Sequence, residues 1–116
     1  MSEVHIVAII HPTPGKVDRL VSLLKGMCKS VHEKEDYTLR YIGTEQIGPG
    51  EEKPETPDIV MIETYKDKAS AEKHTTEPHF KQLFATFDEE GLMAKPPYLA
   101  QTKSISGFDL DRKFIS

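Results

Sequence analysis

The side chains of this chain best suited to acid–base chemistry lie in residues 62–83. His74 and His79 are separated there by the segment TTEP, and Glu63 precedes them. An imidazole titrates near neutral pH, so a histidine can take a proton from a substrate and later return it. Two interpretations of His74 remain open: a general base, or a structural histidine that ties the end of a short helix to a strand.

The neighbours of His74 suggest how it would be held. A hydrogen bond to Glu63 would orient the imidazole under either interpretation, and we expect that bond. His79 follows Pro78 in the first turn of a helix, where a positive charge is unfavourable, so we expect a neutral imidazole. It either contacts a ligand or lies on the surface.

Aromatic residues surround this segment in the sequence. Phe80 and Phe84 lie on the apolar face of the helix that Pro78 opens, while Tyr41 and Tyr65 belong to β-branched, strand-like runs. Such side chains can line a pocket and orient a phenolic ligand, or they can simply pack in a core. Both possibilities remain open.

A metal site is not expected. His5 and His11 share a strand face but are separated by roughly 20 Å along an extended chain, too far to bind one ion. His74 and His79 lack the spacing that places two ligands on one helical face. Cys28 lies on an apolar helical stripe, where a thiol is buried and inert.

Composition excludes several classes of function. The 116 residues carry a net charge of −4 with a pI near 5.7, and no basic stripe suggests nucleic-acid binding. No apolar run approaches the ~20 residues that cross a bilayer, so no membrane partner is expected. A single cysteine suits a reducing compartment, and we expect a cytoplasmic protein.

Hydrophobic periodicity predicts four strands and three helices. Strands are expected at 4–11, 37–47, 59–65 and from Tyr98, and an amphipathic helix at about 14–32, capped by the Thr13 hydroxyl. Asp67 caps a short helix that ends near His74, and Pro78 opens another. The segment 48–58 is rich in proline, glycine and acid, which predicts a solvated loop.

This order, β-α-β-β-α-β, predicts an α+β, ferredoxin-like fold with helices on one face of a four-stranded antiparallel sheet. Strands 4–11 and 59–65 are apolar on both faces, so the second face needs a cover. The chain has no spare helix, and we therefore expect a homodimer. The domain is expected at 1–106, followed by a C-terminal tail at 107–116 with exposed apolar residues.

The segment IETYKDKASAEKHTTEPHF resembles the signature of the antibiotic biosynthesis monooxygenase-like domain. The matching positions include Glu63, Tyr65, His74, His79 and Phe80, and the likeness extends by pattern over about 4–106. The family's Glu-Pro-Gly-Cys turn is Glu-Asp-Tyr-Thr here. The resemblance implies a dimeric α/β barrel with a pocket between each sheet and its helices. Characterised members oxidise quinols or polycyclic phenols with O₂ and need no metal or flavin.

The resemblance implies a cofactor-independent monooxygenase that acts on a small aromatic quinol or phenol. His74 would be the base and Glu63 its orienting partner, and the expected substrate-binding residues are Tyr41, Tyr65, His79, Phe80 and Phe84. Haem degradation, another activity of the family, is disfavoured because the chain lacks tryptophan. The alternative is a non-catalytic small-molecule-binding or structural dimer module of the same fold.

Overall fold

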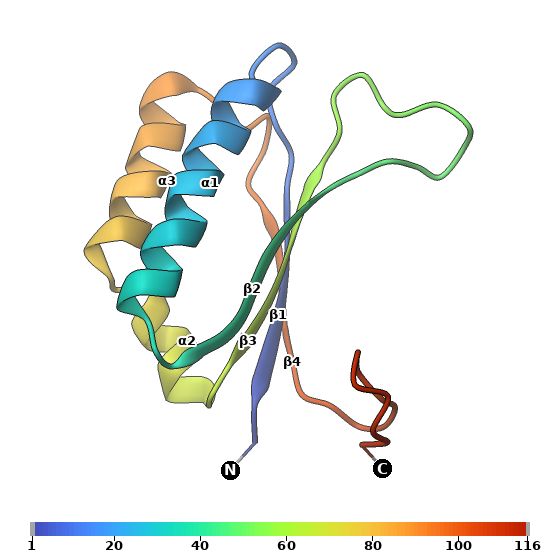
Figure 1. The fold of residues 1–116 in the computed structure, drawn as a ribbon. Helices are drawn as coiled ribbons and strands as arrows, with labels where there is room; N and C mark the ends of the chain where they lie inside the picture. Colours follow the sequence, from blue (N-terminus) through green and yellow to red (C-terminus); the bar gives the residue numbers. More distant parts are fainter. Residues whose placement is uncertain (1, 116) are drawn as a thin grey trace.

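The structure is a computed structural model that describes residues 2–115, and it consists of one sheet covered on one face by helices (Figure 1). The elements, in chain order, are β1 (Val4–Ile10), α1 (Val17–Lys34), β2 (Thr38–Glu45), β3 (Ile59–Tyr65), α2 (Lys68–His74), α3 (Pro78–Glu90) and β4 (Tyr98–Thr102).

The four strands form an antiparallel sheet in the order β2-β3-β1-β4. Helices α1 and α3 lie side by side over one face of it (Figure 1). The predicted ferredoxin-like α+β fold is confirmed.

Local signals place the two helices that surround the candidate site. The Asp67 carboxylate accepts a hydrogen bond of 2.8 Å from the Ser70 amide and caps α2, as predicted. Pro78 is the first residue of α3, where its missing N–H costs nothing. Gly91 ends α3 in the left-handed region, with φ of 61°. These caps set where α2 ends and therefore where His74 lies.

The predicted cap of the first helix is wrong. Helix α1 begins at Val17 instead of Pro14, and the Thr13 hydroxyl donates to the Gly91 carbonyl oxygen at 2.7 Å. Gly15 has φ of 81°, so the segment PTPG forms a turn before the helix starts. Thr13 thus ties that turn to the end of α3.

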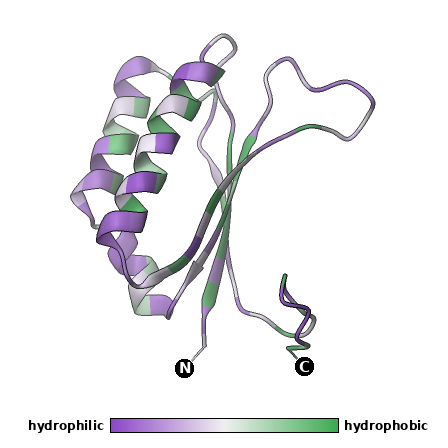
Figure 2. Ribbon diagram, viewed as in Figure 1, coloured by the Kyte–Doolittle hydropathy of each residue, from purple (hydrophilic) through white to green (hydrophobic). Residues whose placement is uncertain are grey.

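The core lies between the helices and the sheet, where the apolar stripes face inward (Figure 2). Leu20, Leu24, Met27 and Val31 recur at helical spacing along α1 and are buried. A satellite cluster around Tyr65, which is fully buried, extends the core under α2.

Within residues 2–115, no helix covers the opposite face of the sheet, called here the open face (Figure 1). Register places on it one alternate set of strand residues: His5, Val7, Ile9, Arg40, Ile42, Thr44, Val60, Ile62, Thr64, Tyr98, Ala100 and Thr102. Most are apolar or β-branched, and Ile42, Ile62 and Tyr98 are exposed in the single chain. The open face is therefore an exposed apolar surface of the kind that a partner buries.

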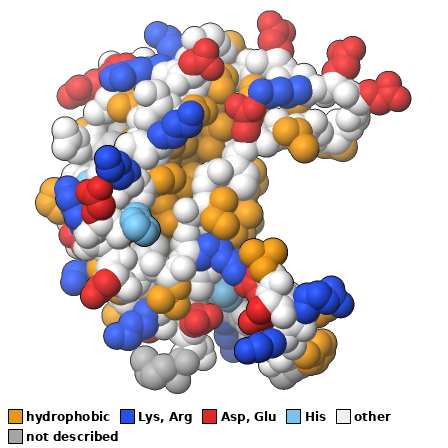
Figure 3. Space-filling model, viewed as in Figure 1, with side chains coloured by type: hydrophobic (Ala, Val, Ile, Leu, Met, Phe, Trp, Pro, Cys, Tyr) orange, Lys and Arg blue, Asp and Glu red, His pale blue; other side chains and the backbone are white. Residues whose placement is uncertain are grey.

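Two segments extend past the sheet on the side of the open face: residues 46–58, between β2 and β3, and residues 103–115, after β4 (Figure 1). Together with the sheet they give the molecule a concave outline in Figure 3. The radius of gyration is 15.1 Å, above the roughly 13 Å expected of a compact chain of this length. The excess reflects these projecting segments.

Candidate functional site

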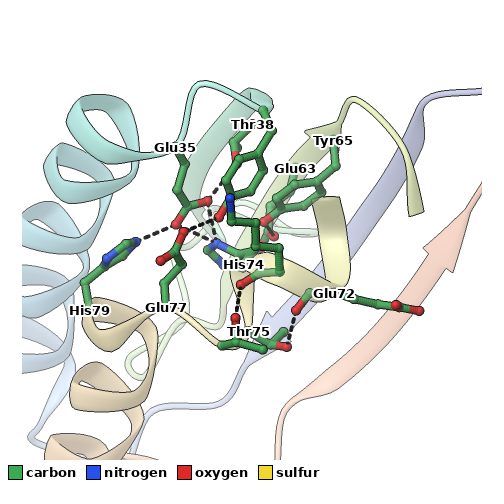
Figure 4. A network of polar contacts seen from close by, with 12 residues as sticks. Glu35, Thr38, Glu63, Tyr65, Glu72, His74, Thr75, Glu77 and His79 are labelled. Atoms are coloured by element: carbon green, nitrogen blue, oxygen red, sulfur yellow. Dashed lines mark hydrogen bonds and ion pairs between the residues drawn. The ribbon is translucent and has the colours of Figure 1, made fainter. Parts of the chain in front are cut away.

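His74 is the last residue of α2 and is almost completely buried, with 3% of its surface exposed. Its Nδ1 lies 2.8 and 2.9 Å from the two carboxylate oxygens of Glu35 (Figure 4). The prediction that Glu63 holds His74 is wrong, because the Oε1 of Glu63 accepts a hydrogen bond of 2.6 Å from the Tyr65 hydroxyl instead. Glu63 and Tyr65 lie on the same face of β3, so that bond is local.

Glu35 was not among the expected site residues. It caps the C-terminus of α1, it is 2% exposed, and its carboxylate accepts from three side chains. Besides His74, these are the Thr38 hydroxyl at 2.7 Å and the Nε2 of His79 at 2.5 Å (Figure 4). One signal could have revealed it: Glu35 is the only residue of the family's Glu-Pro-Gly-Cys turn that this chain keeps.

The pairing with Glu35 fixes the tautomer of His74. A carboxylate only accepts hydrogen bonds, so Nδ1 carries the proton and the lone pair of the neutral ring lies on Nε2. Nε2 makes no hydrogen bond within residues 2–115. None of their buried side-chain nitrogens or oxygens lacks a partner, so Nε2 must keep accessible surface. The unprotonated nitrogen of the neutral ring is therefore not sealed inside the core.

The space next to His74 is a cavity of about 300 Å³ between the sheet and α3. Its walls are mainly apolar, and four of the predicted site residues besides His74 line it: Tyr41, Glu63, Phe80 and Phe84. The rings of Phe80 and Tyr41 lie 5.1 and 5.5 Å from that of His74. The structure thus gathers these side chains, which come from β2, β3, α2 and α3, around one cavity.

Tyr65 and His79 do not line that cavity. Tyr65 is fully buried behind it, with its ring 5.3 Å from His74 and its hydroxyl on Glu63. His79 faces a surface groove between α1 and α3 and reaches the site only through Glu35. Neither residue is therefore placed to contact a ligand in this cavity.

Burial sets the protonation states in the cavity. It lowers the pKa of His74 despite the opposing effect of Glu35, so the imidazole is neutral at pH 7. Burial also raises the pKa of Glu63 to about 7, partly opposed by the bond from Tyr65. The pKa of Tyr41 rises for the same reason, so its phenol stays protonated. The cavity thus offers a neutral base, a carboxyl group near half-protonation and a phenol.

Glu63→Gln is expected to stabilise the protein by an amount that grows as the pH rises above about 4.5 and levels off above about 7. The folded-state pKa of Glu63, about 7, exceeds its ordinary 4.5, so the folded state retains a proton that the unfolded chain releases. Wild-type stability therefore falls as pH rises from about 4.5 to 7, by at most about 3 kcal/mol. The glutamine carbonyl oxygen can still accept from Tyr65 without this cost. Urea unfolding at about pH 4 and pH 8 measures the effect, and equal gains at both pH values would contradict it.

Across residues 2–115, no group of three or more His, Cys, Asp or Glu side chains has the arrangement of a metal site. The same part of the chain holds no helix long and apolar enough to span a bilayer. Cys28 lies on α1 near β2, where it is half-buried, and burial raises the pKa of its thiol.

The sequence profile of the antibiotic biosynthesis monooxygenase family matches residues 3–86. Solved structures share the fold. A conserved protein from Methanosarcina mazei Go1 has a TM-score of 0.76 at 22% identity, over 90% of this chain and 95% of that one. A protein from Mycobacterium tuberculosis has a TM-score of 0.74 at 22% identity, over 90% and 96%.

A candidate antibiotic biosynthesis monooxygenase from Caulobacter crescentus CB15 superposes with a TM-score of 0.73 at 18% identity, over 90% of this chain and 91% of that one. At such identities the likeness shows the fold alone. No curated protein matches the chain.

Proposed function

Because this chain belongs to the antibiotic biosynthesis monooxygenase family, we propose that it is a cofactor-independent monooxygenase that oxidises a small aromatic quinol or phenol with O₂. His74 is the general base. Glu35, in place of Glu63, is the positioning residue that holds it. Tyr41, Glu63, Phe80 and Phe84 bind the substrate.

One observation carries this proposal: a buried, neutral histidine that lines an apolar cavity, with its Nδ1 held by a carboxylate and its Nε2 unbonded and accessible. A histidine in that state accepts a proton at one defined atom. A nearby carboxylate also stabilises the imidazolium that forms. A purely structural histidine would gain nothing from an accessible Nε2 at the wall of a cavity.

The chemistry needs little else from the protein, because the substrate supplies the electrons. Nε2 of His74 takes the phenolic proton, and the electron-rich phenolate reduces O₂ and forms a carbon–oxygen bond at the ring, giving a hydroperoxide. The O–O bond then breaks as the ring carbon loses its proton, which leaves a carbonyl. The distal oxygen leaves as water with the two protons released. One O₂ is consumed per substrate, and one of its atoms stays in the product.

The cavity suits a small aromatic ligand. A volume of about 300 Å³ lies at the lower end of small-molecule pockets. Phe80 and Phe84, with ring centres 4.8 Å apart, offer ring faces and edges to such a ligand. Tyr41 and Glu63 are directly paired across β2 and β3, so their polar ends can hold a second oxygen of the substrate. The apolar walls exclude water from the reacting ring.

We also propose that the protein works as a cytoplasmic homodimer whose open faces pack together. Val7, Ile9, Ile42, Val60 and Ile62 supply a contiguous apolar surface on three neighbouring strands. Covering it by a second copy removes that surface from water and gives each sheet two buried faces.

Oxygen uptake with a panel of hydroquinones and anthrols tests the proposed reaction. The purified protein is expected to consume one O₂ for each substrate molecule and to release no hydrogen peroxide. An isotope measurement with ¹⁸O₂ should find one labelled atom in the product. If ligands quench or shift the tyrosine fluorescence but no substrate is consumed, the protein is a binding module and the proposed activity is wrong.

A further inference from the structure

The segments that flank the open face carry opposite charge. The acidic loop, residues 46–58, contains the exposed Glu51, Glu52 and Glu55, and its one lysine, Lys53, is paired with Glu45. The basic tail, residues 103–115, contains Lys103, Arg112 and Lys113 against two aspartates, one of which is paired with Arg40. Each segment therefore has unbalanced charge of one sign.

The two segments lie at opposite ends of the open face. The loop joins the end of β2 to the start of β3, where Ile10 of β1 pairs with Ile59. The tail follows β4 at the other end of the sheet, where His5 pairs with Thr102. Figures 1 and 3 show both projecting on the side away from the helices, one at each end of the concavity.

The basic tail is attached to the edge of the open face. His5 Nε2 lies 2.7 Å from the Ser104 hydroxyl, and Arg40 pairs with Asp109; both His5 and Arg40 belong to the open face. A bridge between Phe108 and Phe114 folds the tail back on itself. These contacts hold the tail at the rim of the surface.

The tail is held in place yet leaves large apolar side chains in water. Leu110 is 91% exposed and Phe114 is 70% exposed. Side chains of this size contribute to stability only when they are buried, and the contacts of the tail within its own chain do not bury them. The tail lies at the rim of the open face, so a partner that packs on the open face can also bury these side chains.

Symmetry and charge together determine how a second copy is oriented. When two identical sheets pack face to face, the two-fold axis lies in the plane of the interface, and its two limiting directions are along the strands and across them. An axis along the strands brings loop to loop and tail to tail, which places like charges together. An axis across the strands brings each acidic loop to the partner's basic tail. The second arrangement is electrostatically favourable at both ends.

We propose that two copies of this chain pack open face to open face with the two-fold axis across the strands, so that the acidic loop of each subunit binds the basic tail of the other. This inference rests on the homodimer proposed above. Tail side chains such as Leu110 and Phe114 then cover the partner, and the loop–tail contact occurs twice in each dimer. The segments thus act as paired clasps that set the orientation of the sheets.

Charge reversal tests the clasp. The tail variant Arg112→Glu with Lys113→Glu, and the loop variant Glu51→Lys with Glu52→Lys, are each expected to raise the dimer dissociation constant by at least about tenfold at low ionic strength, because every reversed contact occurs twice. Combining the four changes should return the constant to within about threefold of wild type. Sedimentation velocity over a dilution series measures it.

A matched control carries the same charge change on the helical side. Lys29→Glu with Lys81→Glu alters exposed residues of α1 and α3 and should leave the dissociation constant unchanged. An unchanged constant in both reversed variants, or a combined variant weaker than either, would overturn the clasp and leave the homodimer standing. A wild-type protein that stays monomeric at every concentration would overturn the homodimer as well.

Cysteine cross-linking tests the orientation directly in a Cys28→Ser background. Glu52→Cys together with Lys113→Cys should give a covalent dimer on mild oxidation, whereas either cysteine alone should not. A covalent dimer from Glu52→Cys alone would show loop against loop and overturn the proposal. A covalent monomer from the double variant would show that the tail of a chain binds its own loop, with the same consequence.

Discussion

His74→Asn is expected to lower kcat/KM for an oxidised quinol by about 10²–10⁴-fold, the usual contribution of a general base. The asparagine amide nitrogen can take the position of Nδ1 and still donate to Glu35, so the buried carboxylate keeps a partner. The variant lacks any basic atom equivalent to Nε2 at the cavity wall. Steady-state oxygen uptake measures the loss, and thermal unfolding checks that the fold is retained.

His11→Asn is the matched control for this variant. The Nδ1 of His11 also pairs with a carboxylate, that of Asp58 at 3.0 Å, but the residue does not line the cavity. The same chemical change there should leave kcat/KM within a few-fold of wild type. Equal rates in wild type and His74→Asn would remove His74 from the mechanism.

The pH dependence of the wild-type rate should identify the same group. Burial disfavours the imidazolium of His74 and places its pKa below the ordinary 6.5. The neutral form is the base, so kcat/KM is expected to fall as the pH decreases through a value below 6.5. Above that value His74 is fully neutral, and its titration no longer changes kcat/KM. That acidic limb should be absent from the residual activity of His74→Asn. Glu63, with a pKa of about 7 in the same cavity, is removed from the profile by Glu63→Gln, and an acidic limb centred above 6.5 in that variant would contradict the assignment.

Glu35→Gln is expected to lower kcat by about 10²–10⁴-fold, with a smaller change in KM, although Glu35 lies outside the cavity. A glutamine offers one acceptor and one donor where the carboxylate accepts from His74, His79 and Thr38. An amide N–H facing Nδ1 of His74 would move the ring proton to Nε2. The lone pair would then face the glutamine, and the cavity would lose its base.

The tautomer of His74 distinguishes a positioning role of Glu35 from a purely structural one, because only loss of a positioning role would change it. Nitrogen-15 chemical shifts of the His74 ring should show the proton on Nδ1 in the wild type and on Nε2 in Glu35→Gln. We also expect the free energy of unfolding to fall by about 1–3 kcal/mol, because a buried donor loses its partner. A destabilised variant with an unchanged tautomer and unchanged kcat would leave Glu35 with a structural role only.

Local sequence signals predicted most of the fold because they act over a few residues. The short apolar run at Ile59–Tyr65 predicted β3 with its observed bounds, and Asp67 and Pro78 correctly marked the starts of α2 and α3. Thr13 does not cap α1 because the turn at Gly15 delays the start of the helix, and because the Thr13 hydroxyl donates to the distant carbonyl oxygen of Gly91. Such competition is invisible in a local pattern.

The site was only partly predictable for the same physical reason. The residue types of His74, Tyr41, Phe80 and Phe84 indicated chemistry and a ligand surface, and the tertiary structure places all four around one cavity. Which carboxylate holds His74 depends on how the end of α1 meets the end of α2. Glu35 reaches the imidazole across that junction, while Glu63 is taken by a hydroxyl on its own strand.

The sequence by itself thus determined the order of the strands and helices, the apolar character of both sheet faces, and the identity of the one histidine that ends α2. Only the tertiary structure decided which groups meet: the Glu35–His74 pair, the accessible Nε2, and the position of the two charged segments at opposite ends of the open face. Periodicity reports which face of an element is buried. Contacts between distant elements depend on the packing of whole helices against the sheet, which no short stretch of sequence encodes.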